Sequence, residues 1–385
     1  MGIDFFQSSR FFGIMNEKLE TGNWKFGSAN VEQLLRLSLS ASPNFQFLIS
    51  YFRFMLKVAI NGFGRIGRAA FRIILERQDM QVVAINDLGD VKNLAYLLKY
   101  DSVYRRFDRA VEARDKGLSV GGKMFQFYSI AEAEKLPWGK LGVDVVLECS
   151  GAMTTQEAAE LHLKAGAKKV LISAPTKSEG VVTAVRGVNE EKIKGQNIVA
   201  NASCTTNCVA PIMAVLDEAF GVEKSLLTTV HAMTASQRTV DSVNPKDWRE
   251  GRAASANMIP STTGAAIATA LVLPQLENKF DGIAVRVPVL CGSLSDIVAV
   301  LKKNVTVEQV NGAFTKAAKD KRFNGILETT EDELVSADIL GTTASAIVDL
   351  KFTKVVDGNL VKVLAWYDNE WAYANRLVEM AERMG

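Results

Sequence analysis

Hydrophobic and polar positions along the chain change their spacing at Met55. From there, short runs rich in Val, Ile and Ala alternate with segments of helical period. This rhythm of strand, turn and helix predicts an α/β fold with a doubly wound parallel sheet. The strands predicted here are Lys57–Asn61, Gln81–Asn86, Val143–Glu148 and Lys169–Ser173, and the helices are Ile66–Arg77 and Thr155–Ala165.

Beyond about residue 204 the apolar runs become longer and predict a second domain. This pattern favours an α+β domain with a mixed or antiparallel sheet. The β-rich segments lie at 225–230, 282–287 and 294–301, and the helices at 205–220, 264–273 and 307–319. We therefore predict a first domain over 55–203, a second over 204–369, and a final amphipathic helix at 370–385 that returns to the first domain.

Residues 1–54 share neither pattern. They are rich in Phe, Asn and Ser and keep no sustained helical or strand period. A targeting peptide is one interpretation, yet Asp4, Glu17 and Glu20 make the segment too acidic for a typical organellar transit sequence. We expect a leader that lies upstream of a working start at Met55 and that is poorly ordered or loosely attached.

The composition excludes several classes of function. The 385 residues carry a formal charge of +2, too little for a protein whose main task is nucleic-acid binding. No apolar run reaches the roughly 18 residues that a membrane span needs. The four cysteines and two histidines have no zinc-site spacing, so we expect no metal, and free thiols are the default in a chain this long.

A glycine-rich turn directly follows the first predicted strand. The segment Gly62-Phe63-Gly64-Arg65-Ile66-Gly67 has the GxGxxG spacing, and a place between strand and helix is what a dinucleotide site of the Rossmann type requires. The turn and the helix N-terminus bind a pyrophosphate. Asp87 ends the next strand, where a carboxylate accepts hydrogen bonds from ribose hydroxyls and repels a 2′-phosphate, which favours NAD over NADP. The alternative is an ordinary glycine turn beside a surface Asp.

Cys204 is the candidate nucleophile. It lies where an apolar run passes into a helix, and a helix N-terminus lowers the pKa of a thiol and can hold an oxyanion. Cys208, one turn further on, is expected to be buried as a small apolar residue. His231 ends a predicted strand and is the candidate base. The alternatives are that both cysteines and the strand-end histidine are purely structural.

Groups suited to anions gather in the second domain. Ser203, Thr205 and Thr234 carry hydroxyls near the candidate thiol. The segment Pro260-Ser261-Thr262-Thr263-Gly264 precedes a predicted helix, as an ordinary N-cap or as an anion site. Arg286 is a charge within an apolar strand; such an Arg is usually paired or faces the surface, but in a cleft it binds a phosphate bidentately.

Three motifs carry a resemblance to a known family. Asn61–Arg68, Ala202–Asn207 and Trp366–Trp371 resemble the corresponding segments of glyceraldehyde-3-phosphate dehydrogenases, and the similarity runs from Met55 to the C-terminus. The resemblance implies NAD-dependent oxidation and phosphorylation of D-glyceraldehyde 3-phosphate to 1,3-bisphosphoglycerate through a thioester, in a cytoplasmic homotetramer of the glycolytic pathway. The chain departs from the family at Val289-Leu290-Cys291, where a Thr and an Asn are common.

The resemblance also implies a role for individual residues. It makes Cys204 the nucleophile and His231 its base. The residues implied for the cofactor are Gly62, Gly64, Arg65, Ile66, Gly67, Asp87, Ser173, Asn369 and Tyr373; those for the substrate phosphate are Thr234 and Arg286, and those for inorganic phosphate are Ser203, Thr205, Thr263 and Gly264. Two alternatives stay open: an erythrose-4-phosphate dehydrogenase, which transfers the acyl group to water, and a binding protein without catalysis on the same fold.

Overall fold

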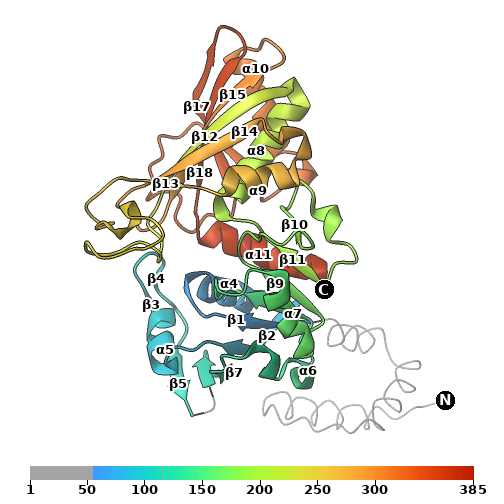
Figure 1. Cartoon of the computed structure of the whole chain (residues 1–385), viewed down its shortest axis with the longest axis vertical. Coiled ribbons are helices and arrows are strands. Elements are labelled where there is room, and N and C mark those ends of the chain that lie inside the picture. Colours follow the sequence, from blue (N-terminus) through green and yellow to red (C-terminus); the bar gives the residue numbers. More distant parts are fainter. Residues whose placement is uncertain (1–54, 116) are drawn as a thin grey trace, which may run out of the picture. The chain divides into compact units, whose positions relative to one another are not determined.

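The computed structural model describes residues 55–115 and 117–385, so the leader predicted over residues 1–54 lies outside the described residues. The first sheet of the described part has the strand order β10-β11-β9-β8-β1-β2-β7-β6-β5 (Figure 1). Its strands are β1 Leu56–Asn61, β2 Met80–Asn86, β5 Val111–Arg114, β6 Gly117–Val120, β7 Lys123–Tyr128, β8 Val145–Glu148, β9 Lys169–Ile172, β10 Val182–Thr183 and β11 Ile198–Ala200.

The strands from β10 to β7 run parallel, and β6 and β5 extend the edge in antiparallel pairing. This confirms the predicted doubly wound parallel sheet. A two-stranded ribbon lies apart, with β3 Tyr100–Asp101 and β4 Arg105–Arg106. The helices of this part are α4 Arg65–Leu75, α5 Val91–Lys99, α6 Trp138–Leu141 and α7 Gln156–Lys164.

Apolar cores cover both faces of the first sheet because successive side chains of a strand point to opposite faces. In β1, Val58 and Ile60 pack with Phe71 of α4 in one core. Ala59, between them, packs with Trp138 in the core on the other face. Burial on both sides explains why the strands of this sheet read as continuous apolar runs.

The second sheet mixes parallel and antiparallel pairs in the order β13-β14-β12-β15-β18-β17-β16. The pairs β12–β14 and β16–β17 are parallel, and the other pairs are antiparallel, which confirms the predicted mixed sheet. The strands are β12 Val222–His231, β13 Ile259–Thr262, β14 Phe280–Arg286, β15 Ser293–Leu301, β16 Leu327–Thr330, β17 Ala346–Val356 and β18 Leu360–Tyr367; the helices are α8 Cys204–Phe220, α9 Ala265–Val272 and α10 Val307–Ala318.

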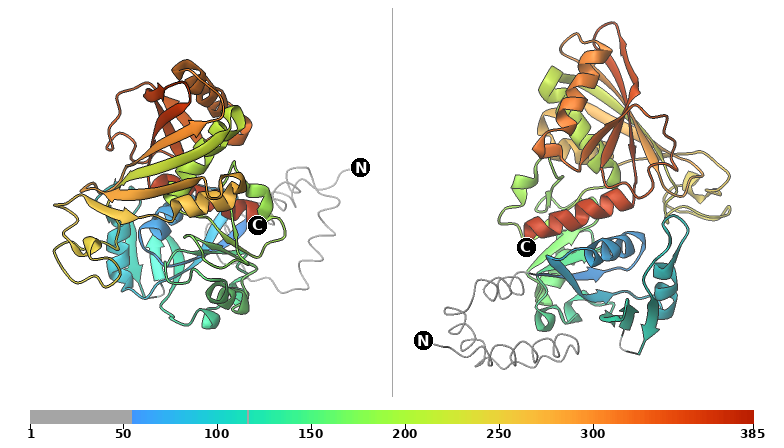
Figure 2. Two further views of the ribbon diagram at one scale, coloured as in Figure 1. Left: turned by 45° about the horizontal axis from the view of Figure 1, so that its top comes forward. Right: turned by 180° about the vertical axis from the view of Figure 1, so that it is seen from behind.

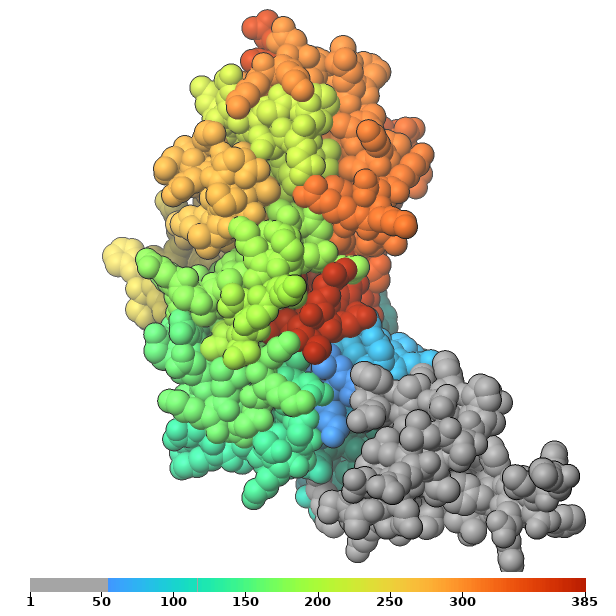
Figure 3. All heavy atoms as spheres, turned by 90° about the vertical axis from the view of Figure 1, so that its right-hand side faces the viewer, coloured from blue at the N-terminus to red at the C-terminus, as the bar shows by residue number. Residues whose placement is uncertain are grey.

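The last helix, α11 Trp371–Met384, follows the second sheet directly but packs on the first. Leu377, Met380 and Ala381 belong to the same core as Phe71 of α4. Figure 2 shows α11 between the two sheets, and Figure 3 shows the C-terminal residues, in red, against the blue segment that begins the described chain. The end of β18 and the start of α11 are therefore held by both sheets.

Candidate active site

A cavity of about 980 Å³ collects most of the residues predicted to be functional. Its volume falls within the range of sites for cofactors and small molecules. The predicted residues that line it are Arg65, Ile66, Ser173, Ser203, Cys204, Thr205, His231, Thr234, Thr263, Gly264, Arg286, Asn369 and Tyr373. The remaining predicted residues, Gly62, Gly64, Gly67 and Asp87, lie in or beside the glycine turn that leads into Arg65.

The turn that carries the candidate nucleophile is tight and strained. After β11, Ala202 adopts a φ of 54°, a left-handed conformation that is costly for a residue with a Cβ. Ser203 then caps helix α8, because its Oγ accepts a hydrogen bond from the backbone N–H of Thr206 at 3.1 Å. Cys204 is the first residue of α8, and Cys208 is fully buried in the core below, as predicted.

Cys204 and His231 form a direct pair. The sulfur of Cys204 lies 3.4 Å from Nε2 of His231, at the end of β12. Nδ1 of His231 lies 2.7 Å from the carbonyl oxygen of Ala232. Because a carbonyl oxygen can only accept, Nδ1 carries the proton, and the lone pair of Nε2 in the neutral ring points at the thiol. His231 thus has the tautomer that its predicted role as a base requires.

Burial sets the protonation of this pair. Burial, and next the nearby Arg286 guanidinium, lower the pKa of His231 to about 4. Burial raises the pKa of the Cys204 thiol, although Arg286 and the Thr205 hydroxyl act in the opposite direction. The backbone amides of Cys204 and Thr205 at the helix terminus lower this pKa, as expected, but the loss of hydration outweighs them, so the net pKa is raised. Burial thus favours the protonated thiol and the neutral imidazole.

Arg286 offers an unsatisfied cation beside the pair. It ends β14, next to His231 in the parallel pairing of β14 with β12. Among the described residues, no group accepts a hydrogen bond from its buried Nε or Nη1 atoms. A buried guanidinium without acceptors is costly unless an anion binds it. These two nitrogens are therefore suited to an anion.

Hydroxyls from two loops also line the cavity. The Thr234 hydroxyl is 3.0 Å from the Ser236 hydroxyl, and the Thr234 amide donates to Gln237 Oε1 at 3.0 Å. Thr263 Oγ1 accepts from the Ala265 amide at 3.2 Å. The N-cap of α9 is Gly264, with no side-chain cap, and Pro260–Thr262 belong to β13. The interpretation of a Ser or Thr N-cap is thus wrong, because Ser261 and Thr262 pair with β14 and Gly264, after Thr263, holds the N-cap position.

The glycine turn has the shape of a dinucleotide cradle. Gly62 has a φ of 91°, and a Cβ there would lie 2.4 Å from the Ser150 nitrogen. A Cβ at Gly67 would lie 2.1 Å from the Gly62 carbonyl oxygen, whereas a Cβ at Gly64 would meet nothing within 4 Å. Helix α4 has no side-chain cap, so its first-turn amides remain available as donors. These features fit a pyrophosphate at this helix end.

Asp87 follows β2 and binds the glycine turn itself. Its Oδ2 accepts from the Phe63 amide at 2.6 Å, and its Oδ1 accepts from the Gly89 amide at 2.7 Å. The carboxylate is thus fixed at the edge of the sheet where a ribose would lie. It has a second, structural task in holding the turn, which the sequence pattern does not reveal.

Three further residues predicted for the cofactor line the same cavity. Asn369 is 6% exposed, and its Oδ1 accepts from the Gly292 amide at 3.1 Å and the Ser293 hydroxyl at 2.9 Å. This leaves its Nδ2 group to donate. Tyr373 donates to the Ala202 carbonyl oxygen at 3.1 Å, and Ser173 donates to the Tyr373 hydroxyl at 3.4 Å. Tyr373 therefore braces the turn before Cys204.

Sequence reasoning missed Tyr367. Its hydroxyl lies 2.9 Å from Thr205 Oγ1 and 2.8 Å from Thr229 Oγ1. Its ring stands edge-on to His231, with centroids 6.0 Å apart. Tyr367 thus packs the imidazole and links the start of α8 to β12. The alternation of side chains along a strand places Thr229 and His231 on one face, and this signal could have pointed to a partner that packs against both.

A dinucleotide cradle and a thiol–imidazole pair that share one cavity define a class: cysteine-dependent, dinucleotide-using dehydrogenases. Residues 56–156 match the model described as the NAD binding domain of glyceraldehyde 3-phosphate dehydrogenase, and residues 203–369 match the model of its C-terminal domain. The chain belongs to the glyceraldehyde-3-phosphate dehydrogenase family. This confirms the resemblance, the fold class and the prediction of NAD as the cofactor.

The sequence of this chain aligns with curated relatives along nearly their whole length. The chain is 52% identical over 333 residues to the glyceraldehyde-3-phosphate dehydrogenase of Streptomyces coelicolor, which covers 86% of this chain and 98% of that protein. It is 50% identical over 333 residues to the enzyme of Clostridium pasteurianum, covering 85% and 98% of the two chains. It is 50% identical over 328 residues to that of Geobacillus stearothermophilus, covering 85% and 97%.

The cysteines, the possible metal ligands and the helix lengths describe the protein further. All four cysteines, Cys149, Cys204, Cys208 and Cys291, are free thiols. Within residues 55–115 and 117–385, no three His, Cys, Asp or Glu side chains gather as metal ligands would. In the same part of the chain, every helix is too short or too polar to cross a membrane.

Proposed function

We propose that this protein oxidises D-glyceraldehyde 3-phosphate with NAD and inorganic phosphate, and releases 1,3-bisphosphoglycerate. The observation that carries the proposal is the 3.4 Å contact between Cys204 Sγ and His231 Nε2, next to Arg286, whose buried Nε and Nη1 have no acceptor among the described residues. A thiol with a base forms a thioester from an aldehyde, and the cation selects a phosphorylated substrate.

In the first step His231 Nε2 takes the proton of the Cys204 thiol, and the sulfur adds to the aldehyde carbon. The carbonyl oxygen becomes an alkoxide and takes the proton back, which gives a hemithioacetal. The amides at the start of α8 stabilise the oxygen while it is charged. The hydrogen bond from Nδ1 to the Ala232 carbonyl holds the ring in place throughout.

In the second step His231 removes the hydroxyl proton of the hemithioacetal. Bound NAD supplies the hydride acceptor at this point. Asn369 would hold its nicotinamide amide, with Tyr373 packed nearby, and Arg65, Ile66 and Asp87 would hold its pyrophosphate and ribose. What remains on Cys204 is a thioester, which keeps the free energy of oxidation because water does not attack it.

In the third step an oxygen of inorganic phosphate attacks the thioester carbon, and the Cys204 sulfur leaves as a thiolate that recovers a proton. Ser203, Thr205, Thr263 and Gly264 would bind the attacking phosphate, and Thr234 and Arg286 the phosphate of the substrate. All of these residues line the same cavity, which supports two neighbouring anion sites.

We further propose domain limits, an assembly and a location. Residues 55–203 with α11 form the NAD-binding domain, and residues 204–369 form the catalytic domain.

The outer face of the second sheet exposes apolar side chains, with Leu226 at 65% and Ile283 at 51%. A second copy of the chain would cover this face, since one self-complementary patch suits the twofold interfaces of a homotetramer. The four free thiols fit the reducing cytoplasm.

The rate of NADH formation tests the proposal. With glyceraldehyde 3-phosphate, steady turnover should require inorganic phosphate and should yield an acyl phosphate. Erythrose 4-phosphate is the matched alternative substrate, and turnover with it at a rate independent of phosphate would favour the erythrose-4-phosphate dehydrogenase reading. Absence of NADH formation with both substrates would favour a binding protein.

A further inference from the structure

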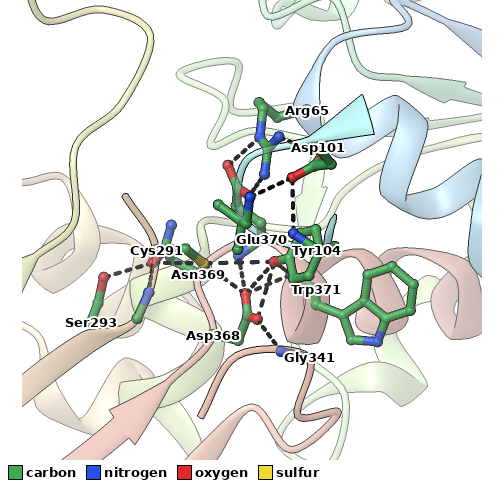
Figure 4. Close-up of polar contacts among 12 residues, drawn as sticks. Arg65, Asp101, Tyr104, Cys291, Ser293, Gly341, Asp368, Asn369, Glu370 and Trp371 are labelled. Carbon is green, nitrogen blue, oxygen red and sulfur yellow. Dashed lines mark hydrogen bonds and ion pairs between the residues drawn. The ribbon is translucent and has the colours of Figure 1, made fainter. Parts of the chain in front are cut away.

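Asp368 is the centre of a buried polar network next to Asn369 (Figure 4). Its Oδ1 accepts from the Tyr104 hydroxyl at 2.8 Å and from the Cys291 thiol at 3.1 Å. The Tyr104 oxygen and the Cys291 sulfur are themselves 3.6 Å apart. Asp368 is 1% exposed, so these two donors replace water around the carboxylate.

Backbone amides complete the shell of this carboxylate. Glu370 and Trp371 donate to Oδ1 at 2.9 and 2.8 Å, and Gly341 donates to Oδ2 at 2.8 Å. The Trp371 amide also donates to the Tyr104 hydroxyl at 3.1 Å. The residues on both sides of Asn369 are therefore fixed through a single side chain.

The loop that carries Cys291 also holds the amide of Asn369. The Gly292 amide and the Ser293 hydroxyl both donate to Asn369 Oδ1, and the Cys291 thiol lies 3.7 Å from the same oxygen. With Oδ1 turned to these donors, Nδ2 is the half of the amide that remains for the cofactor. The contact between Cys291 and Asp368 keeps this loop in register with Asn369.

Tyr104 extends the network to the glycine-turn helix. It lies between β3 and β4, and its ring packs 5.2 Å from the Trp371 ring and 5.7 Å from the Arg65 guanidinium. Arg65 in turn donates to Glu370 at 2.8 Å and to Asp101 at 2.6 Å. Burial, and then Asp368, raise the pKa of the Tyr104 phenol and of the Cys291 thiol, so both groups stay protonated donors.

We propose that Tyr104 and Cys291 are positioning residues that act through Asp368 to hold the Asn369 amide in the orientation that receives the nicotinamide. This inference rests on the proposed role of Asn369 in binding NAD. Neither side chain is proposed to touch the cofactor. Their effect is confined to the nicotinamide end of the site, whereas the glycine turn keeps its own support from Asp87.

Binding of NAD and of ADP-ribose, which lacks only the nicotinamide, tests this proposal. Replacing Tyr104 by Phe removes the donor to Asp368 but keeps the ring, and should raise the Kd for NAD roughly 3- to 30-fold, the range for coupled neighbours. The Kd for ADP-ribose should stay the same. Cys291→Ala should act in the same direction, and Cys291→Ser, which keeps a donor, should restore most of the affinity.

Two controls separate positioning from a general loss of structure. Tyr96→Phe makes the same chemical change at a residue that is 60% exposed, and should alter neither constant. In an Asn369→Ala background, Tyr104→Phe should have no further effect on NAD binding. The proposal would be overturned if Tyr104→Phe weakened the binding of NAD and ADP-ribose equally, or kept its full effect in the Asn369→Ala background. Neither result would contradict the proposed function, because the parent enzyme would still be active. A parent that reduces no NAD with the triose phosphate would remove the proposed function, and this inference with it.

Discussion

Nε2 of His231 lies 3.4 Å from the sulfur of Cys204, and Nδ1 of the same ring lies 2.7 Å from the carbonyl oxygen of Ala232. The contact with Ala232 keeps the proton on Nδ1, so Nε2 has a free lone pair that faces the sulfur. Burial favours the neutral forms of both side chains. The pair is therefore a neutral thiol beside a neutral imidazole whose acceptor nitrogen faces it, and its charge develops during the reaction.

The lowered pKa of His231 makes stability depend on pH. In the unfolded chain a histidine titrates near ~6.5, whereas in the folded protein this pKa falls to about 4. Between these values the unfolded state binds the extra proton, so the stabilisation is complete above pH ~6.5 and is lost as the pH falls towards ~4. Urea unfolding at pH 7 and pH 5 should show that the parent loses roughly 1–2 kcal/mol more than His231→Gln over this range. Equal losses in the two proteins would mean that His231 is not held neutral.

Asp87 should control both cofactor choice and the glycine turn, because its oxygens accept from the Phe63 and Gly89 amides. Asp87→Asn removes the charge and keeps one acceptor oxygen, which can serve the Phe63 amide while the exposed Gly89 amide turns to water. The ratio of kcat/KM for NADP to that for NAD should therefore rise, with a smaller loss of stability than Asp87→Ala gives. Asp87→Ala should raise the ratio too and should also lower stability by about 1–3 kcal/mol, the cost of leaving the amide of the buried residue Phe63 without its acceptor. A ratio unchanged in both variants would place the ribose elsewhere.

Arg286 should matter more for phosphorylated than for plain substrates. Arg286→Lys keeps the charge but loses the fork of donors, so kcat/KM for glyceraldehyde 3-phosphate should fall roughly 10- to 100-fold. For unphosphorylated glyceraldehyde the change should be much smaller. Arg114→Lys, at a side chain that is 62% exposed, is the matched control. Equal losses with both aldehydes would show that Arg286 does not bind the substrate phosphate.

The elements of both sheets that carry the site were predictable because their signals are local. The predicted strand Lys57–Asn61 and helix Ile66–Arg77 correspond to β1 Leu56–Asn61 and α4 Arg65–Leu75. Apolar runs and a glycine turn specify such a unit without help from distant residues. The same holds for the helix that begins at Cys204, which a short polar turn introduces.

What the sequence could not give depends on distant partners. The edge strands β5 and β6 pair antiparallel beside β7, and nothing in their short, mixed sequences marks that edge. The network of Asp368 joins residues that are 264 and 77 positions apart in the chain. The net rise in the pKa of Cys204 is not predictable for a similar reason, because burial is a property of the assembled site and not of the helix terminus.

The leader should be dispensable for catalysis. The strand that feeds the glycine turn begins at Leu56, and relatives that align over 98% of their own length cover only 86% of this chain. A protein that begins at Met55 should therefore match the full chain in kcat, KM and melting temperature. An inactive or insoluble truncated form would show that residues 1–54 are part of the functional structure.

The most direct test of the account is to trap the acyl group on the enzyme. The protein is mixed with glyceraldehyde 3-phosphate and NAD without inorganic phosphate, quenched in acid, digested, and analysed by peptide mass spectrometry. We predict a phosphoglyceroyl thioester on the peptide that contains Cys204, absent from the Cys204→Ser protein and discharged when phosphate is added before the quench. NADH formation with no acyl group on Cys204, or with the group on Cys149, Cys208 or Cys291, would contradict the account.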